Sequence, residues 1–178
     1  MSRLLLVLLV LLPLWNDPCV AQGKARQGTS TSTRTISVPS SFSARVVGIK
    51  DGDTVELLYA GAQIRARLAH IDAPESSQPF GKAAKQQLSG LCYGRTVRVE
   101  QTGLPDRYGR LIAVIICEEV NVNRSMVRSG YAWHFIKYSK DMSYAGAERE
   151  ARAARRGLWA DPGPVSPWDW RASRRKMK

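Results

Sequence analysis

Histidine and cysteine are scarce in this sequence, which limits the metals that it can hold. Its 178 residues include two histidines and three cysteines. Structural zinc sites use four such ligands at short, regular spacings. His70 and His134 stand at no recognisable spacing from the cysteines, so the sequence does not predict a zinc centre.

A hydrophobic run of membrane-spanning length is also missing. The longest apolar run covers residues 4–15, which is 12 residues, whereas a transmembrane helix needs about 20. Arg3 before this run, and Cys19 and Ala21 after it, are typical of a secretory signal that is cut after Ala21. We therefore expect residues 1–21 to be a cleaved signal peptide and the mature protein to be secreted or periplasmic, without membrane attachment. An uncleaved anchor is the alternative.

Acidic residues are few relative to basic ones. The chain has 15 Asp and Glu against 27 Lys and Arg, a formal net charge of +12. Residues 1–21 contain one Arg and one Asp, so this charge survives signal removal. A hydrophobic content of 44% excludes wholesale disorder. A folded protein this basic is expected to bind an anionic partner, either nucleic acid or an acidic surface.

Export would place the remaining cysteines in an oxidising compartment. Cys19 would leave with the signal peptide, whereas Cys92 and Cys117 would stay in the mature chain. Two cysteines in an exported protein most often pair. We therefore expect a disulfide between Cys92 and Cys117, with two buried free thiols as the alternative.

The mature chain divides into a linker, one folded domain and a tail. Residues 22–41 are rich in Ser, Thr and Gly and lack apolar periodicity, which is typical of a flexible linker. The domain is expected over residues 42–161. The tail, residues 162–178, is basic and has no apolar stripe, and we expect Trp168 and Trp170 to pack back on the domain.

Alternation of polar and apolar residues predicts five short strands in the domain. They are expected at residues 46–49, 54–59, 63–68, 96–100 and 110–116. Helical spacing of apolar residues predicts about three helices, at residues 80–91, 121–127 and 147–157. This order favours an α+β fold dominated by a five-stranded OB-fold β-barrel, with an open α+β sheet as the alternative.

The predicted hairpin between the second and third strands brings charged residues together. With its turn at Ala-Gly, Thr54 lies opposite Arg67, and Asp53 lies opposite Leu68. Asp72 is four residues beyond Leu68, roughly 13 Å along a straight strand. It can join Asp53 and Arg67 only if the strand curls or bulges, as barrel strands do.

Asp53 and Asp72, once adjacent, would form a pair of hard oxygen ligands. Completed by backbone carbonyls and water, such a pair suits Ca²⁺ or Mg²⁺ rather than a soft metal. The alternative is that each aspartate serves a turn, because Asp-Gly and Asp before Ala-Pro both begin turns. An EF-hand is excluded, since no Glu stands at the required spacing and the flanks are predicted strands.

Two arginines and a glutamate accompany these aspartates. Arg110 begins the fifth strand, Arg67 lies in the third, and Glu75 follows it. A guanidinium binds phosphate oxygens through two parallel donors and stays protonated. Arg110 taken alone is typical of a surface charge, but together these groups are the ones needed to hold and hydrolyse a phosphodiester.

The order of these groups resembles the staphylococcal nuclease, or thermonuclease, family. The resemblance covers residues 42–160 and rests on segments that are weak singly and specific in combination. They are Asp-Gly-Asp-Thr-Val (51–55), Arg67 five residues before Asp72, Asp-Ala-Pro-Glu (72–75), Asp-Arg-Tyr-Gly-Arg (106–110), the stretch from Val-Asn to Gly at 122–130, and Gly-Leu-Trp (157–159).

The resemblance implies a Ca²⁺-dependent, sugar-nonspecific endonuclease that cleaves DNA and RNA to leave 3′-phosphates, with single-stranded or locally melted substrates favoured. It acts, by the same implication, as a monomer. The implied roles are Asp53, Asp72 and the Ala73 carbonyl for Ca²⁺, Glu75 as general base, Arg67 and Arg110 for the scissile phosphate, and Tyr108 and Tyr138 beside the nucleotide. The family usually has Thr in place of Ala73, a change that a carbonyl ligand tolerates.

Two other functions are compatible with parts of the sequence. A binding module would hold nucleic acid on the same barrel without cleaving it, but modules of that kind usually lose the carboxylates or arginines. In this sequence all five of these side chains are present, namely Asp53, Arg67, Asp72, Glu75 and Arg110. An exported protein that binds acidic cell-surface polymers would explain the charge but not the carboxylates.

Overall fold

A computed structural model describes residues 38–176 of the protein. The predicted signal peptide, residues 1–21, and most of the predicted linker, residues 22–41, lie outside this range. The end of that linker differs from the expectation, because the first strand already begins at Ser41.

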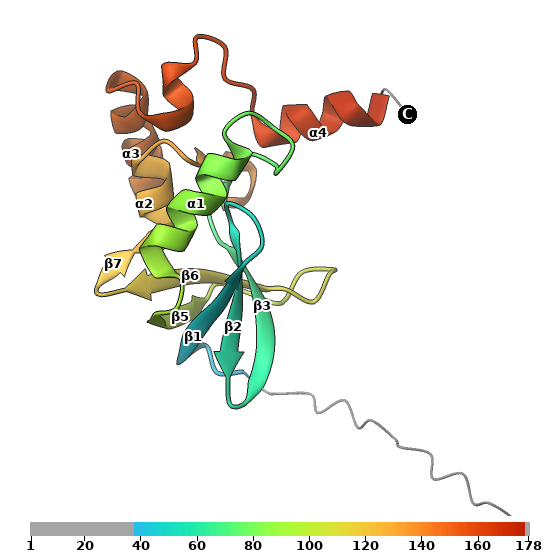
Figure 1. Cartoon of the computed structure of the whole chain (residues 1–178), viewed down its shortest axis with the longest axis vertical. Helices are drawn as coiled ribbons and strands as arrows, with labels where there is room; N and C mark the ends of the chain where they lie inside the picture. The colour runs from blue at the N-terminus through green and yellow to red at the C-terminus, as the bar shows by residue number, and fades with distance from the viewer. Residues whose placement is uncertain (1–37, 177–178) are drawn as a thin grey trace, which may run out of the picture. The chain divides into compact units, whose positions relative to one another are not determined.

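Five strands of the described range form a closed barrel (Figure 1). They are β1 (Ser41–Ile49), β2 (Thr54–Tyr59), β3 (Ala62–Leu68), β5 (Thr96–Gln101) and β6 (Leu111–Cys117). Antiparallel neighbours follow the order β3-β2-β1-β5-β6, and a parallel pairing of β3 with β6 closes the ring. The predicted five-stranded OB-fold barrel is confirmed, and the open sheet is not.

Alternating side chains of the strands fill the barrel interior. In β6, every second residue from Leu111 to Cys117 is buried, and the residues between them are half-buried. β1 is longer than its apolar run predicts, because its first half pairs with β5 and its second half with β2. A bulge between Val46 and Gly48 lies where β1 passes from one partner to the other, and bulges of this kind increase strand curvature.

Three helices gather at one end of the barrel (Figure 1). They are α1 (Gly81–Cys92), α2 (Val122–Arg128) and α3 (Met142–Ala153). α1 buries Ala84 and Leu88. α2 is capped by Asn121, whose side chain accepts a hydrogen bond from the Arg124 N–H at 2.9 Å, as predicted for an N-cap. No helix of residues 38–176 is long and apolar enough to cross a membrane.

Short elements join the barrel to the helices. They are the strands β4 (Ile71–Asp72), β7 (Val120–Asn121) and β8 (Trp133–His134), and the 3₁₀ turns η1 (Ile136–Tyr138) and η2 (Gly157–Ala160). β4 pairs antiparallel with β8, so that Asp72 lies opposite Trp133. This pairing fixes the segment after β3 against the segment after α2.

A fourth helix, α4 (Pro167–Lys176), occupies the tail, for which no helix was predicted. Ser166 caps it, because its Oγ accepts a hydrogen bond from the Asp169 N–H at 3.2 Å. Pro167 at the first helical position is favourable there, since it has no N–H to leave unpaired. Trp168 packs on the domain as predicted, edge-on to Trp133 with ring centroids 5.6 Å apart.

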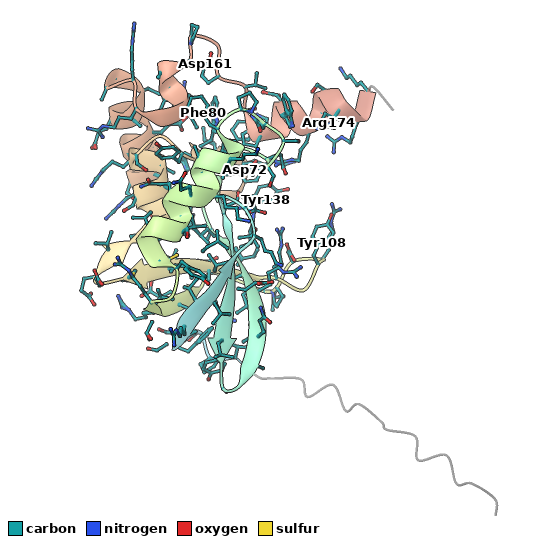
Figure 2. All side chains as sticks on the ribbon, viewed as in Figure 1. Asp72, Phe80, Tyr108, Tyr138, Asp161 and Arg174 are labelled. Atoms are coloured by element: carbon teal, nitrogen blue, oxygen red, sulfur yellow. The ribbon has the colours of Figure 1, made fainter. Side chains whose placement is uncertain are left out.

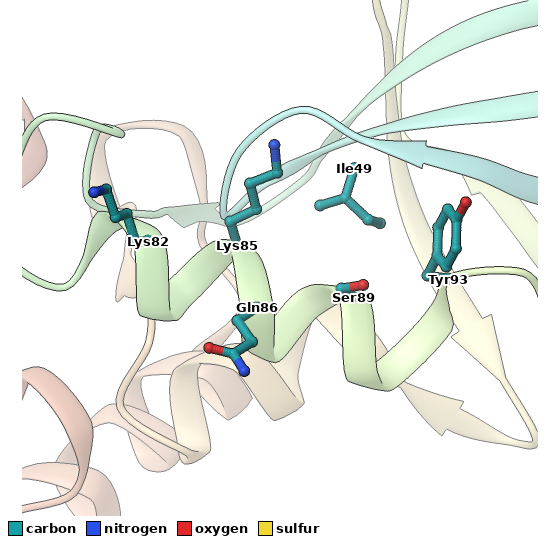
Figure 3. A pocket seen from close by; sticks show the side chains of 6 residues that line it. All are labelled: Ile49, Lys82, Lys85, Gln86, Ser89 and Tyr93. Atoms are coloured by element: carbon teal, nitrogen blue, oxygen red, sulfur yellow. The ribbon is translucent and has the colours of Figure 1, made fainter.

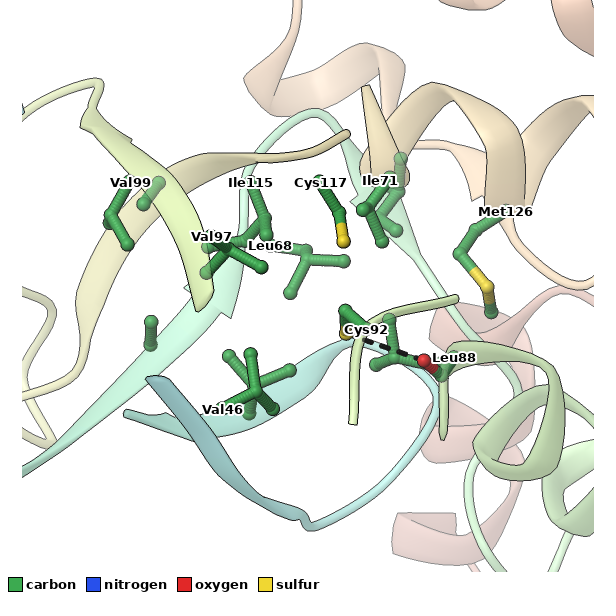
Figure 4. Close-up of a cluster of buried hydrophobic side chains, with 14 of the residues drawn as sticks. Val46, Leu68, Ile71, Leu88, Cys92, Val97, Val99, Ile115, Cys117 and Met126 are labelled. Atoms are coloured by element: carbon green, nitrogen blue, oxygen red, sulfur yellow. Dashed lines mark hydrogen bonds between the residues drawn. The ribbon is translucent and has the colours of Figure 1, made fainter. Parts of the chain in front are cut away.

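Cys92 and Cys117 are free thiols, which corrects the predicted disulfide. Both are buried in the core between the barrel and α1 (Figure 4). The Cys92 thiol donates to the carbonyl of Leu88, one helical turn earlier, at 3.3 Å. Burial raises the pKa of the Cys92 thiol to about 12, so it stays neutral and packs as a small apolar side chain.

Candidate nuclease active site

The β2–β3 hairpin places Asp53 beside Arg67. Thr54 pairs with Arg67 across the ladder, and the N–H of Leu68 donates to the carbonyl of Asp53 at 2.8 Å. Both pairings are the ones that the predicted turn requires. Nη2 of Arg67 lies 3.0 Å from Oδ2 of Asp53, so the predicted proximity of the two side chains is confirmed.

A reversal of the chain at His70 brings Asp72 to the same place. His70 adopts a left-handed φ of 70°, and β4 follows immediately. Nη1 of Arg67 donates to the carbonyls of Leu68 and Ile71, both at 3.0 Å, and Nη2 donates to Oδ1 of Asp72 at 2.9 Å. The fold therefore uses a tight turn, held by Arg67, where the sequence predicted a curled or bulged strand.

Both aspartates are buried, with 6% of Asp53 and 1% of Asp72 exposed. The Asp53 carboxylate accepts hydrogen bonds from the N–H of Ala73 at 2.7 Å and the hydroxyl of Thr54 at 3.3 Å. Burial raises the pKa of Asp53 to about 7, although the neighbouring Arg67 opposes this shift. The charged form of Asp53 would therefore be favoured by a further cation close by.

The oxygen donors of this region suit a hard divalent cation. Within residues 38–176, no group of three or more His, Cys, Asp or Glu side chains could hold a metal. A cation at Asp53 and Asp72 would therefore need further oxygens, which the backbone at Ala73 and water can supply. Ca²⁺ accepts mixed sets of carboxylate, carbonyl and water oxygens. The structural observation that favours such a cation is that two buried carboxylates line one cleft together with Ala73.

Glu75 stands on the loop between β4 and α1. The N–H of Gln78 donates to the Glu75 carbonyl at 2.8 Å, and the Gln78 side-chain oxygen accepts from the Glu75 N–H at 3.2 Å. Gly81 packs so closely on the Glu75 carbonyl that a Cβ there would overlap it. The backbone of the loop is therefore firmly held, while the Glu75 side chain remains 42% exposed.

Arg110 reaches the site from the loop before β6. Asp106 holds it, because the carboxylate accepts the Arg110 backbone N–H at 3.0 Å and its Nε at 2.8 Å. Nη1 of Arg110 lies 3.5 Å from the hydroxyl of Thr54, the residue opposite Arg67. The two predicted phosphate-binding arginines thus both lie next to Thr54.

The predicted site residues line one cleft of about 890 Å³. The predicted residues that line it are Asp53, Arg67, Asp72, Ala73, Glu75, Tyr108, Arg110 and Tyr138. The two tyrosines are 66% and 69% exposed, and Figure 2 shows them on the same side of the molecule as Asp72. The cleft therefore combines a buried, charged floor with exposed aromatic rings.

Comparison with known proteins decides the family. The family model described as "Staphylococcal nuclease homologue" matches residues 65–161. The chain is 47% identical over 128 residues to an uncharacterized endonuclease of Haemophilus influenzae, an alignment that covers 71% of each chain. It is 42% identical over 149 residues to the micrococcal nuclease of Shigella flexneri, covering 76% of this chain and 85% of that one.

The chain belongs to the staphylococcal nuclease homologue family. This confirms the resemblance found in the sequence and supports hydrolysis of nucleic acid as the chemistry of the cleft. The matched range includes Arg67, Glu75 and Arg110 and ends at residue 161. α4 therefore lies beyond the part of the chain that the family model matches.

Arg171 of α4 is a cleft residue that sequence reasoning missed. Its Nη2 lies 2.6 Å from Oδ2 of Asp72, and its Nη1 lies 2.7 Å from Oε1 of Glu75. The sequence carried one signal for the helix, namely Ser166-Pro167 with Asp169 three residues after the serine, which is typical of a helix start. No local pattern indicates that Arg171 would meet residues almost one hundred positions earlier.

A second, open hollow of about 400 Å³ lies along α1 and contains no carboxylate (Figure 3). Its lining residues are Ile49, Lys82, Lys85, Gln86, Ser89 and Tyr93. The two lysines add to the basic surface, but the hollow has no pair of groups that could act as acid and base. The chemistry is therefore assigned to the larger cleft.

Proposed function

We propose that the protein is an exported, Ca²⁺-dependent endonuclease that hydrolyses phosphodiester bonds of DNA and RNA and leaves 3′-phosphate products. The observation that carries this proposal is the presence of Asp53, Arg67, Asp72, Glu75 and Arg110 in one cleft. The predicted signal peptide supports export, and a monomer suffices because one chain supplies all five side chains.

Asp53 and Asp72 would hold the Ca²⁺ together with the Ala73 carbonyl. When bound, the ion supplies positive charge that offsets the charge of the reacting phosphate. The protein prepares for this by burying both carboxylates and fixing them through Arg67, whose Nη2 lies 3.0 Å from Oδ2 of Asp53 and 2.9 Å from Oδ1 of Asp72. Their orientation therefore does not depend on the ion alone.

Glu75 acts as the general base. Its carboxylate takes a proton from a water molecule as that water attacks phosphorus in line with the 5′ oxygen. The P–O5′ bond breaks, the 5′ oxygen leaves and takes a proton from solvent water, Glu75 returns its proton to solvent, and the phosphate remains on the 3′ side. A correctly placed base of this kind typically contributes about 10²–10⁴-fold to the rate.

Arg67 and Arg110 stabilise the charge that grows on the phosphoryl oxygens in the transition state. Both guanidiniums are already held in place before substrate arrives, Arg67 by Asp53 and Asp72 and Arg110 by Asp106. Donors that are fixed in advance need little reorganisation during the reaction.

Substrate binding relies on charge and stacking rather than on base recognition. The net charge of +12 attracts the phosphate backbone of DNA or RNA alike. The exposed rings of Tyr108 and Tyr138 offer faces on which bases can stack, which every base can do. Stacking requires unpaired bases, so single-stranded or locally melted substrates are favoured.

The decisive experiment compares wild type with Glu75→Gln on a labelled single-stranded oligonucleotide, with Ca²⁺ and with excess EGTA. We expect wild type to cleave only with Ca²⁺, the variant to lose 10²–10⁴-fold in kcat and to bind the oligonucleotide as tightly, and the products to carry 3′-phosphates. Glu118→Gln is the control, since the Glu118 side chain is 75% exposed and pairs with Arg95.

Other outcomes distinguish the alternatives. Tight binding without cleavage by wild type would identify a binding module. Binding to heparin with neither nucleic-acid binding nor cleavage would identify a receptor for acidic polymers. Full cleavage in excess EGTA would contradict the proposed Ca²⁺ site, and unchanged turnover in Glu75→Gln would contradict the proposed role of Glu75 as general base.

A further inference from the structure

α4 carries one of its arginines into the cleft. The Arg171 side chain is 38% exposed, and its two terminal nitrogens are shared between two carboxylates. Nη2 donates to Oδ2 of Asp72 at 2.6 Å, and Nη1 donates to Oδ1 of Asp72 at 3.3 Å and to Oε1 of Glu75 at 2.7 Å. One guanidinium thus joins an aspartate of the floor to the loop glutamate.

The position of Arg171 is set by packing on both sides of the helix. The ring of Trp168 stacks on Phe135, with centroids 5.5 Å apart and planes within 3°. The side-chain nitrogen of Gln78 donates to the carbonyl of Val165, just before α4, at 2.6 Å. Arg174, labelled in Figure 2, donates to the hydroxyl of Ser77 at 2.9 Å. α4 is therefore attached to the same loop that carries Glu75.

The contact engages one oxygen of Glu75 and leaves the other for chemistry. Within residues 38–176, no hydrogen bond or ion pair reaches Oε2 of Glu75, whereas Oε1 is bound by Arg171. A half-exposed glutamate has several rotamers, and a charge-assisted hydrogen bond of 2.7 Å selects those that keep Oε1 on Arg171. Because the two oxygens of a carboxylate are fixed relative to each other, holding Oε1 on Arg171 also restricts the position of Oε2.

We propose that Arg171 is a positioning residue for the hydrolytic reaction: it holds Glu75 by Oε1 so that Oε2 faces the attacking water. This inference rests on the proposed role of Glu75 as general base. It gives α4 a function in the reaction and makes the tail beyond residue 161 part of the active site.

The experiment measures kcat and KM on a single-stranded oligonucleotide at saturating Ca²⁺ for Arg171→Gln and Arg171→Lys. We expect Arg171→Gln to lower kcat by about 10–100-fold, the effect typical of removing an orienting partner, with KM changed less than about threefold. Arg171→Lys keeps the charge but loses the planar fork, so it should recover part of kcat. Lys176→Gln, an equal charge change at an exposed residue of α4 that does not line the cleft, should leave kcat within about twofold of wild type.

A double variant tests whether Arg171 acts through Glu75. In the Glu75→Gln background, Arg171→Gln should lower kcat no further, because residues that act as one unit are not additive. Multiplication of the two effects would overturn the proposal, as would an unchanged or raised kcat in Arg171→Gln. Circular dichroism of both Arg171 variants tests whether the fold is intact. If Arg171→Gln unfolds, the kcat of Arg171→Lys tests the proposal instead.

Failure of this inference and failure of the proposed function give different results. If Glu75→Gln alone leaves kcat unchanged, the proposed base is wrong and the inference falls with it. If Glu75→Gln is impaired but Arg171→Gln is not, the base stands and only the positioning role is lost.

Discussion

Nη2 of Arg67 lies 2.9 Å from Oδ1 of Asp72, and this contact ties the end of β3 to β4 across the reversal at His70. The same nitrogen lies 3.0 Å from Asp53. Because Asp72 is almost fully buried, its charge depends on the guanidiniums that reach it. Arg67 therefore serves the fold as well as the site, and its removal would leave buried Asp53 without an ion-pair partner and buried Asp72 with Arg171 alone.

Arg67→Met should lower the free energy of unfolding by about 3–5 kcal/mol, because breaking a buried ion pair leaves uncompensated charge. Arg65→Met is the matched control on the same strand: the Arg65 side chain is 53% exposed and lies 3.9 Å from Glu56. It should change stability by at most about 0.5 kcal/mol. Urea denaturation without added metal measures both, and equal losses would contradict the structural role of Arg67.

The β2–β3 hairpin and its consequences could be predicted because they depend on local pattern. An Ala-Gly turn sets the register, and the register alone places Thr54 opposite Arg67. The number and spacing of the strands favoured the barrel but left an open sheet as the alternative, which the pairing of β3 with β6 excludes. Local pattern is sufficient where a contact follows from strand register.

Other contacts were missed because strand register carries no signal for them: some depend on a side chain that binds backbone carbonyls, and others join segments that are distant in sequence. The turn at His70 depends on the binding of two backbone carbonyls by Arg67, and the alternation of polar and apolar side chains does not predict these hydrogen bonds. Arg171 reaches Asp72 because contacts such as that of Trp168 with Phe135 hold α4 against the domain, and these contacts are set by tertiary structure. The free state of Cys92 and Cys117 likewise depends on their packing in the core rather than on their number.

Tyr138→Ala should weaken binding of a single-stranded oligonucleotide about 5–150-fold, which corresponds to the roughly 1–3 kcal/mol of one stacked base. Tyr93→Ala is the control, since Tyr93 is 56% exposed at the end of α1 and lies outside the cleft. Fluorescence anisotropy in the Glu75→Gln background measures affinity without cleavage. Equal affinities of the two variants would show that Tyr138 makes no stacking contact.

Acidification should destabilise the fold through His134. Burial lowers the pKa of His134, although Glu148 and Asp141 oppose the shift, and both His134 and His70 bond the hydroxyl of Ser139. The unfolded chain therefore takes up a proton at His134 first, so the contribution of His134 to stability is complete above pH 6.5 and is lost below it, by at most about 1.4 kcal/mol per pH unit. Asp53, whose pKa burial raises to about 7, takes up a proton in the folded state over the same range and opposes this loss. Urea titrations from pH 7.5 to 5 should therefore show that His134→Gln gains stability relative to wild type as the pH falls; a constant difference between the two proteins would exclude His134 as a source.

The two cysteines should be protected by folding rather than by oxidation. In a chain that begins at Gln22, iodoacetamide at pH 8 should add nothing to the folded protein, because both thiols are buried and burial raises the pKa of Cys92 to about 12. After unfolding in guanidinium without a reductant, mass spectrometry should find two adducts. A disulfide would instead give none until a reductant is added.

Two glycines of α1 should respond to alanine in opposite ways. Gly90 has open space around it, so Gly90→Ala should stabilise the protein by about 0.5–1 kcal/mol through helix propensity, with kcat unchanged. Gly81 lies against the carbonyl of Glu75, and a Cβ there must push the loop that holds the base. Gly81→Ala should therefore lower both stability and kcat. Urea denaturation and single-stranded DNA cleavage test the pair, and a Gly81→Ala enzyme with wild-type kcat would show that the position of this loop does not limit the reaction.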